Sequence, residues 1–207
     1  MKKYDCRKHI IALIIFFLWV TPLFAEDIIL DVKPVIQSRQ IANLCAPACA
    51  EMILRFYGIT NISQYDIGKE LLKIDKEQNL QLANQKEYQW PNYQQTYQPS
   101  LALYFKQLGF KVRSTKTNYD KVTGQVNEKM FEGLIDSLRN GVPAIIHVEK
   151  HYMLAVGYNI EDRKLYYINP QDGQRHFISF AAFKNRNSHW YRTNRLGWDG
   201  RFLAAWQ

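Results

Sequence analysis

Cysteine is scarce in this chain, which has three cysteines among 207 residues. Cys6 lies in an N-terminal segment that we expect to be removed, so the remaining chain keeps Cys45 and Cys49. A small secreted protein built on disulfides would carry more of them. Two cysteines four positions apart on one helix face are also poorly placed to bridge, because disulfide geometry is narrow. We therefore expect at least one free thiol, and with it a reactive role.

The chain also lacks a hydrophobic run long enough for a standard membrane-spanning helix. The longest run, residues 10–20, is shorter than the ~20 apolar residues that a span requires. It follows a basic stretch and precedes a short exit of polar and small residues that ends at Ala25. This pattern predicts a bacterial secretory signal over residues 1–25, cut after Ala25, with an uncleaved anchor as the alternative. The protein would then be exported to the periplasm or secreted.

No block of lysine and arginine, internal repeat or domain linker is found in the chain. The formal net charge of +8 falls to +5 once residues 1–25 are removed. Without a basic block, this mild excess does not predict a nucleic-acid groove. A hydrophobic content of 47% is enough for a core, so we expect one domain over residues 26–207.

The hydrophobic pattern changes along the chain, from helical spacing to short β-rich runs. An extended arm or strand is expected within residues 26–39, and a long polar loop over 76–98. Helical spacing and caps predict helices over 45–58, 63–74, 100–108 and 128–139. Short β-rich runs separated by turns predict strands over 110–114, 143–148, 152–158, 165–168, 176–178 and 202–206. Helices followed by an antiparallel sheet indicate an α+β fold.

Cys45 stands where a polar loop turns into the first of these helices. The unpaired N–H groups and the positive end of the helix dipole favour a thiolate over a thiol at such a position. A thiolate is a nucleophile, so this position points to covalent catalysis. Cys49, one turn further on, is expected to be a small core residue.

A nucleophilic cysteine requires a base, and His151 is the best placed histidine. It opens a strong strand, and the next strand ends at Asn169-Pro170. Adjacent antiparallel strands would bring Asn169 beside His151, where its side-chain oxygen can orient the imidazole. Cys, His and Asn form a known arrangement for acyl transfer. The small Gly157 in the same strand would let another element approach closely.

The reaction also requires donors for an oxyanion. The backbone N–H of Cys45 is one candidate, and a glutamine shortly upstream can supply the second. Gln40 and Gln37 are both available.

These residues resemble the motifs of papain-like cysteine peptidases, and most closely those of the bacteriocin-processing (double-glycine leader) peptidase family and its secreted stand-alone relatives. The first motif of that family, glutamine followed by Cys-Gly-x-Ala and a helix ending in Tyr-Gly, is similar to residues 40–58. The second, His-Tyr followed by Gly-Tyr, is similar to residues 151–158, and the third, Asp-Pro with a nearby glycine, to residues 169–173.

The resemblance implies a papain-like α+β fold, with the nucleophile at a helix N-terminus packed on an antiparallel sheet. By position it makes Cys45 the nucleophile, His151 the base, Asn169 the orienting group and Gln40 the oxyanion donor, with Gln37 as the alternative. Two positions depart from the family pattern: Ala46 replaces a glycine, and Asn169 replaces an aspartate, although papain itself has an asparagine there.

The function implied is an exported thiol-dependent hydrolase that cleaves peptide bonds through an acyl-enzyme, with a peptide or protein substrate. No cofactor, nucleic acid or stable membrane span after signal removal is expected. A cell-wall peptide amidase, an acyltransferase and a catalytically inactive binding module on the same fold are the alternatives.

A zinc site is a further alternative, because Cys45, Cys49, His147 and His151 have paired spacings. On one continuous strand the two histidines would lie ~13 Å apart and could not share an ion, whereas a hairpin turn at residues 149–150 would weaken that objection. Otherwise, His147 is expected to be structural.

Overall fold

The computed structural model describes residues 27–78, 90–91, 96–188 and 197–207 of the chain. The predicted signal segment, most of the expected loop over 76–98 and His189 lie outside these residues.

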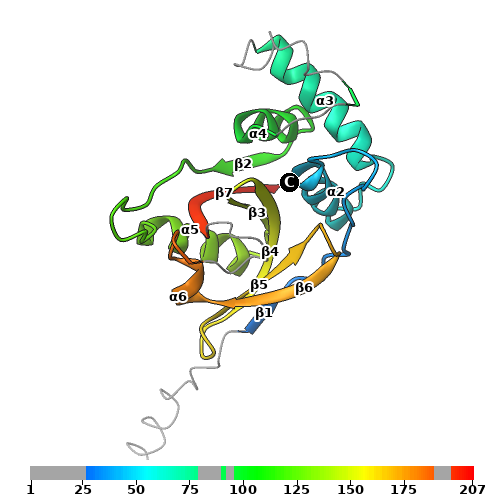
Figure 1. Cartoon of the computed structure of the whole chain (residues 1–207). Helices are drawn as coiled ribbons and strands as arrows, with labels where there is room; N and C mark the ends of the chain where they lie inside the picture. Colours follow the sequence, from blue (N-terminus) through cyan, green and yellow to red (C-terminus); the bar gives the residue numbers. More distant parts are fainter. Residues whose placement is uncertain (1–26, 79–89, 92–95, 189–196) are drawn as a thin grey trace, which may run out of the picture.

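A curved antiparallel sheet forms the centre of the molecule (Figure 1). The strands follow the order β2-β7-β3-β4-β5-β6, and β1 pairs with β4 beside this path. The neighbours β3 to β6 are joined in sequence order, whereas β7 returns from the C-terminus to lie between β2 and β3. The strands are β1 (Asp27–Ile29), β2 (Lys111–Ser114), β3 (Ala144–Val148), β4 (His151–Asn159), β5 (Lys164–Asn169), β6 (Gln174–Ser179) and β7 (Trp198–Trp206).

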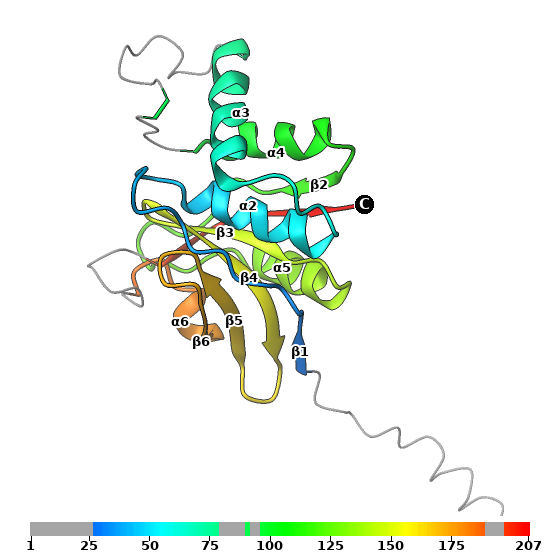
Figure 2. The same cartoon turned by 90° about the vertical axis from the view of Figure 1, so that its right-hand side faces the viewer.

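Helices cover both faces of this sheet (Figures 1 and 2). They are α2 (Cys45–Phe56), α3 (Gln64–Glu77), α4 (Gln98–Gln107), α5 (Glu128–Arg139) and α6 (Phe180–Phe183). Residues of α2, α3 and α4 pack with Ile145, Leu154 and Leu203 in one buried cluster. Residues of α5 and α6 pack with Ile146, Met153 and Phe202 in a second cluster. Alternate residues of each strand thus face different clusters, as the period of a strand requires.

Helix α2 is the most buried of the helices in the described part of the chain, with residues 45–54 all buried. Pro47 fits in its first turn, where the missing N–H would have no partner in the helix. The helix ends at Phe56 and is capped by Tyr57, and the following Gly58 takes a φ of 81°, a left-handed conformation that favours glycine. Only a helix surrounded by other elements can bury both sides, so α2 is a central helix.

Gly157 lies where β1 pairs with β4, opposite Ile29. A Cβ atom at this position would be 2.1 Å from the backbone oxygen of Ile28, which is far inside any tolerated contact. The sequence-based expectation that a glycine here admits another element is therefore confirmed, and the element is β1.

The predicted α+β class and the order of elements are confirmed, with differences at their ends. Helix α3 extends to Glu77, and its expected cap forms a capping box between Ser63 and Asp66. Helix α4 begins at Gln98 because Pro99 is tolerated in a first turn. Strand β7 begins at Trp198, since pairing with Val148 extends it beyond its apolar run. The single turn of α6 was not predicted.

Candidate active site

Cys45 is the first residue of α2 and retains 8% of its surface exposed. Cys49 lies one turn further on and is fully buried. Both cysteines are free thiols, which confirms the expectation of at least one. Burial, and to a smaller extent the neighbouring Cys45, raises the pKa of the Cys49 thiol, so Cys49 stays protonated at neutral pH, as a core residue would.

His151 and Asn169 are joined by a direct hydrogen bond. His151 begins β4, Asn169 ends β5, and His151 Nε2 lies 2.9 Å from Asn169 Oδ1. Both side chains are buried, with 4% exposure each. The structure therefore confirms the expectation that Asn169 lies beside His151.

The orientation of the Asn169 amide is supported on both sides. Its Oδ1 also accepts the backbone N–H of Gln171 at 3.1 Å, and its Nδ2 lies 3.5 Å from Asp172 Oδ2. Asp172 in turn lies 3.0 Å from His176 Nε2. A carboxylate accepts hydrogen bonds and does not donate them when ionised, so Asp172 favours the amide orientation that turns Oδ1 toward His151.

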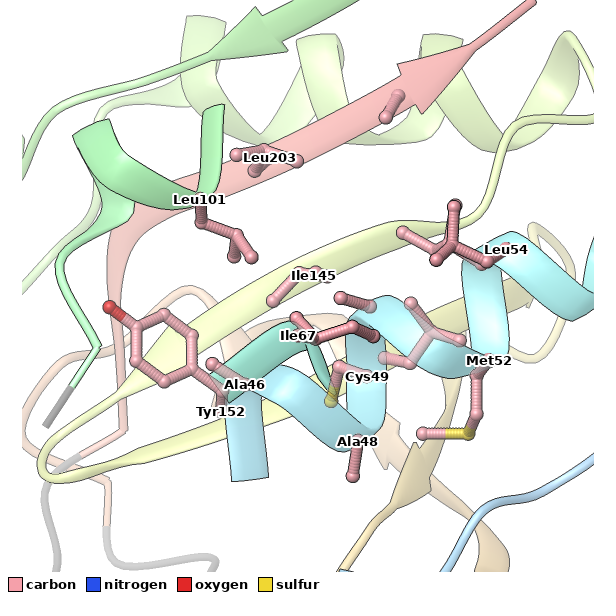
Figure 3. Close-up of a cluster of buried hydrophobic side chains, with 14 of the residues drawn as sticks. Ala46, Ala48, Cys49, Met52, Leu54, Ile67, Leu101, Ile145, Tyr152 and Leu203 are labelled. Carbon is pink, nitrogen blue, oxygen red and sulfur yellow. The ribbon is translucent and has the colours of Figure 1, made fainter. Parts of the chain in front are cut away.

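The N-terminal end of α2 meets the start of β4. The ring of Tyr152 lies beside Ala46 in Figure 3, and Cys45 and Tyr152 belong to the same buried cluster. Burial raises the pKa of Tyr152, and Cys45 is among the charges that raise it further. The first residue of α2 thus lies in the same region as the residue that follows His151, although more than 100 positions separate Cys45 and His151 in the sequence.

The two candidate glutamines differ in burial. Gln40 is exposed, and its backbone N–H donates to Ser38 Oγ. Gln37 is half-buried, and its backbone N–H donates to the carbonyl oxygen of Pro170 at 2.7 Å, directly after Asn169. The Oε1 atom of Gln37 is buried and has no hydrogen-bond partner among the described residues. Of the two, Gln37 therefore lies next to the predicted site.

The four residues of the zinc alternative are not brought together. A hairpin turn does occupy residues 149–150, but Val148 pairs with His151 and His147 pairs with Tyr152. Directly opposed residues share a face, so His147 and His151 lie on opposite faces of the hairpin. Within the described ranges, no three His, Cys, Asp or Glu side chains form a group that could hold a metal ion.

His147 belongs instead to a cluster with Asp199 and Arg201. Its Nδ1 lies 2.9 Å from Asp199 Oδ2, and Arg201 Nη2 lies 2.7 Å from both Nδ1 and that carboxylate oxygen. Burial lowers the pKa of His147, and Asp199 offsets this in part. Burial alone would raise the pKa of Asp199, but hydrogen bonds from His147 and Arg201 outweigh it and lower that pKa.

Sequence reasoning missed Asp172, Asp199 and Arg201. Asp172 lies in a turn between two predicted strands, and its position three residues after Asn169 is a signal that could have suggested the contact. Asp199 and Arg201 gave no local signal, because they reach His147 only through the pairing of β7 with β3.

A free cysteine at the start of a buried helix and a His–Asn pair at the adjoining strand ends, on an α+β fold, are the features of a papain-like cysteine peptidase. The sequence profile of the Peptidase_C39 like family matches residues 29–197, and the chain belongs to this family. No match was found among curated protein sequences.

Solved structures with similar folds include peptidase domains of bacterial transporters. The peptidase domain of Streptococcus ComA, a bi-functional ABC transporter involved in a quorum-sensing pathway, superimposes with a TM-score of 0.51 at 22% identity, over 84% of this chain and 96% of that chain. The corresponding domain from Streptococcus mutans gives 0.43 at 18% identity, over 84% and 99%. UfSP from C. elegans gives 0.47 at 11% identity, over 91% of this chain and 36% of that one. The ComA domain supports the fold assignment.

Proposed function

We propose that this protein is an exported thiol-dependent peptidase that cleaves peptide bonds through Cys45, His151 and Asn169. The observation that carries the proposal is the 2.9 Å hydrogen bond between His151 and Asn169, next to Tyr152, which is buried in one cluster with Cys45. A buried histidine oriented by a side-chain amide is the arrangement that a cysteine nucleophile requires.

The reaction would proceed in two steps. Cys45 Sγ, as a thiolate, attacks the carbonyl carbon of the scissile bond and forms a carbon–sulfur bond. The carbon–nitrogen bond then breaks, and protonated His151 gives its proton to the leaving amine. In the second step water attacks the acyl-enzyme and loses a proton to His151. The carbon–sulfur bond breaks, which releases the acid and restores the thiolate.

Each ring nitrogen of His151 would have one task. Nε2 donates to Asn169 Oδ1, so Nδ1 would exchange the proton with the thiol and the leaving group. An amide oxygen can only accept, so Asn169 selects the tautomer with hydrogen on Nε2 whenever the ring is neutral. Asp172 would act as a positioning residue, because its contact with Asn169 Nδ2 opposes rotation of the amide.

The oxyanion would be held by the backbone N–H of Cys45 and a glutamine amide. We assign this glutamine as Gln37 in preference to Gln40, because Gln37 is half-buried and its backbone is bonded to Pro170. Gln37→Ala would then lower kcat by ~10²-fold, as the loss of one oxyanion donor does, whereas Gln40→Ala would leave it unchanged.

Export is proposed from the basic and apolar pattern of residues 1–25. Within the described residues, no helix combines the length and apolar character needed to cross a membrane. N-terminal sequencing of the protein recovered from a bacterial periplasm should begin at Glu26, and a full-length N-terminus in the cytoplasm would contradict export.

The catalytic proposal is tested by labelling with an epoxide inhibitor of thiol peptidases. A covalent adduct mapped by mass spectrometry to Cys45, together with peptide turnover that Cys45→Ser abolishes while folding is retained, is the expected result. Adduct formation with product transfer to an added amine would indicate an acyltransferase. An unlabelled Cys45 in folded wild-type protein would instead indicate a binding module.

A further inference from the structure

A cavity of about 860 Å³ lies between α4 and the β3–β4 hairpin, and its lining includes Lys150 and Tyr152, the two neighbours of His151 in the sequence. The start of α4, the end of β2 and the hairpin form its walls. The amide nitrogen of Gln98 holds α4 in place, since it lies within 2.9 Å of Ser114 Oγ and of the Thr115 and Phe202 carbonyl oxygens. Because its walls are fixed in this way, the cavity is a built feature of the fold.

Tyr152 connects this cavity with the catalytic region. Its ring belongs to the buried cluster that contains Cys45, and it also lines the cavity. Its hydroxyl donates to the carbonyl oxygen of Thr96 at 3.2 Å, on the opposite wall. Lys150, which also lines the cavity, directly precedes His151. Because Tyr152 lies in the cluster that contains Cys45, a peptide held at Cys45 would have side chains within reach of this cavity.

Cations dominate the lining. Lys106, Lys116, Lys150 and Arg201 all line the cavity, which they approach from different elements. Glu149 is the only carboxylate among the described lining residues, and Arg186 binds it at 3.1 Å. The lysines thus give the cavity a positive charge that no lining residue offsets.

Arg201 adds a fixed donor group to this charge. Its Nε and Nη2 atoms bind Asp199 Oδ2 at 2.9 and 2.7 Å, and Asp199 is almost fully buried. The side-chain contacts of Arg201 with Asp199 and His147 are made by its Nε and Nη2 atoms. A guanidinium held rigidly on one side can present its remaining N–H groups to a carboxylate.

We propose that this cavity binds an acidic side chain of the peptide substrate, close to the scissile bond. The assignment to a substrate rests on the proposed peptidase function. The wall formed by Ala102 and Leu103 fits the aliphatic part of a glutamate, and the lysines and Arg201 fit its carboxylate. Opposite charges in a partly enclosed site favour binding and discriminate against neutral side chains of the same shape.

The test uses the chain from residue 26 onward with Cys45→Ala, so that peptides bind without being cleaved. Fluorescent Ala-Gly octapeptides, each with a single Glu at one position, are compared with the same peptides carrying Gln. We expect one or two Glu positions to bind ~5-fold more tightly than Gln at low salt, and we expect 0.5 M NaCl to remove most of this difference.

Charge reversal at the cavity gives the matched comparison. Lys106→Glu and Lys116→Glu change exposed side chains, so the fold should be retained, and each should reduce the Glu preference by ~2- to 5-fold. Lys129→Glu changes the charge equally on α5, away from the cavity, and should leave the preference unchanged. Equal binding of Glu and Gln peptides at every position, or equal effects of all three reversals, would overturn the proposal.

This test does not depend on catalysis. If Cys45 proved unreactive while the Glu preference followed Lys106 and Lys116, the peptidase proposal would fail and the acidic site would remain. If Cys45 reacted and peptides were cleaved without regard to acidic residues, the acidic site would fail and the peptidase proposal would remain.

Discussion

Two histidines on one hairpin, His147 and His151, have opposite surroundings. His151 is bonded to an uncharged amide on β5, whereas His147 is bonded to a carboxylate on β7 and lies next to Arg201. The pairing of β3 with β4 places them on opposite faces, although they lie only four positions apart.

The difference shows how one hairpin can place two histidines in different surroundings. At His147 a buried carboxylate, a guanidinium and the ring satisfy one another, which suits a fixed structural contact. At His151 the amide fixes the direction of the ring without adding a charge, which suits the proton exchange proposed for this residue. A histidine that is to cycle between protonation states requires the second environment.

Replacing each histidine by alanine is the strongest way to break this comparison. His151→Ala should lower kcat/KM by ~10³-fold, because it removes the proposed base, with a small effect on stability. His147→Ala should instead reduce the free energy of unfolding by ~1–3 kcal/mol, because Asp199 loses a partner in a buried site. Peptide turnover and urea unfolding of both variants would show the two losses. Similar losses of activity in both would contradict the division of tasks.

Changing the orienting partner should have the next largest effect. Asn169→Ala leaves the His151 ring without its 2.9 Å contact, so the imidazole would lose its direction. We expect kcat to fall by ~10²-fold while KM changes little, as a misplaced catalytic group would cause. Steady-state kinetics of Asn169→Ala and Asn169→Gln would check this, and an unchanged kcat in the alanine variant would sink the assignment.

The pH dependence of stability should report on the surroundings of His147 and Asp199. The pKa of His147 lies below its ordinary value of 6.5 because of burial, and that of Asp199 lies below 3.8 despite burial. Both groups therefore bind protons more readily in the unfolded chain. Their contribution to the free energy of unfolding is complete above pH 6.5 and is lost on acidification, first through His147 and then, below pH 3.8, through Asp199.

Each unit by which such a pKa is lowered is worth ~1.4 kcal/mol. Urea unfolding should therefore show that the free energy of unfolding of the wild type is lower at pH 5 than at pH 7. This difference should be smaller in His147→Gln. A wild type equally stable at both values would contradict the surroundings described for His147.

The smallest effect is expected at Asp172. Its carboxylate contacts Asn169 Nδ2 at 3.5 Å, and Asn169 keeps its other contacts without it. Asp172→Ala should lower kcat by ~2- to 5-fold, about the worth of one weak hydrogen bond. The matched control is Asp162→Ala, which changes an exposed turn elsewhere and should leave kcat unchanged.

Much of the fold was predictable because its elements carry clear local signals. The Ser63 cap, the glycine after α2 and the short β-rich runs of β3 to β6 each mark an element without long-range information. The proximity of His151 and Asn169 was also predictable, since adjacent hairpin strands must bring their ends together.

The remaining features depend on pairings between distant segments. The contact of His147 with Asp199 arises only when β7 inserts beside β3. The cavity is lined by α4 and the β3–β4 hairpin, which are far apart in the sequence, and the choice between Gln37 and Gln40 depends on the contact of Gln37 with Pro170. No local pattern encodes these placements, because each results from tertiary packing.

The central claim, that His151 keeps Cys45 ionised, is tested most directly by the rate of iodoacetamide alkylation of Cys45 across pH 5 to 9, with the adduct mapped by mass spectrometry. The account predicts rapid alkylation at pH 6 in the wild type and in His147→Ala, and in His151→Ala a shift toward the profile of an ordinary cysteine, centred near ~8.5. A wild-type profile like that of an ordinary cysteine, unchanged by His151→Ala, would contradict it.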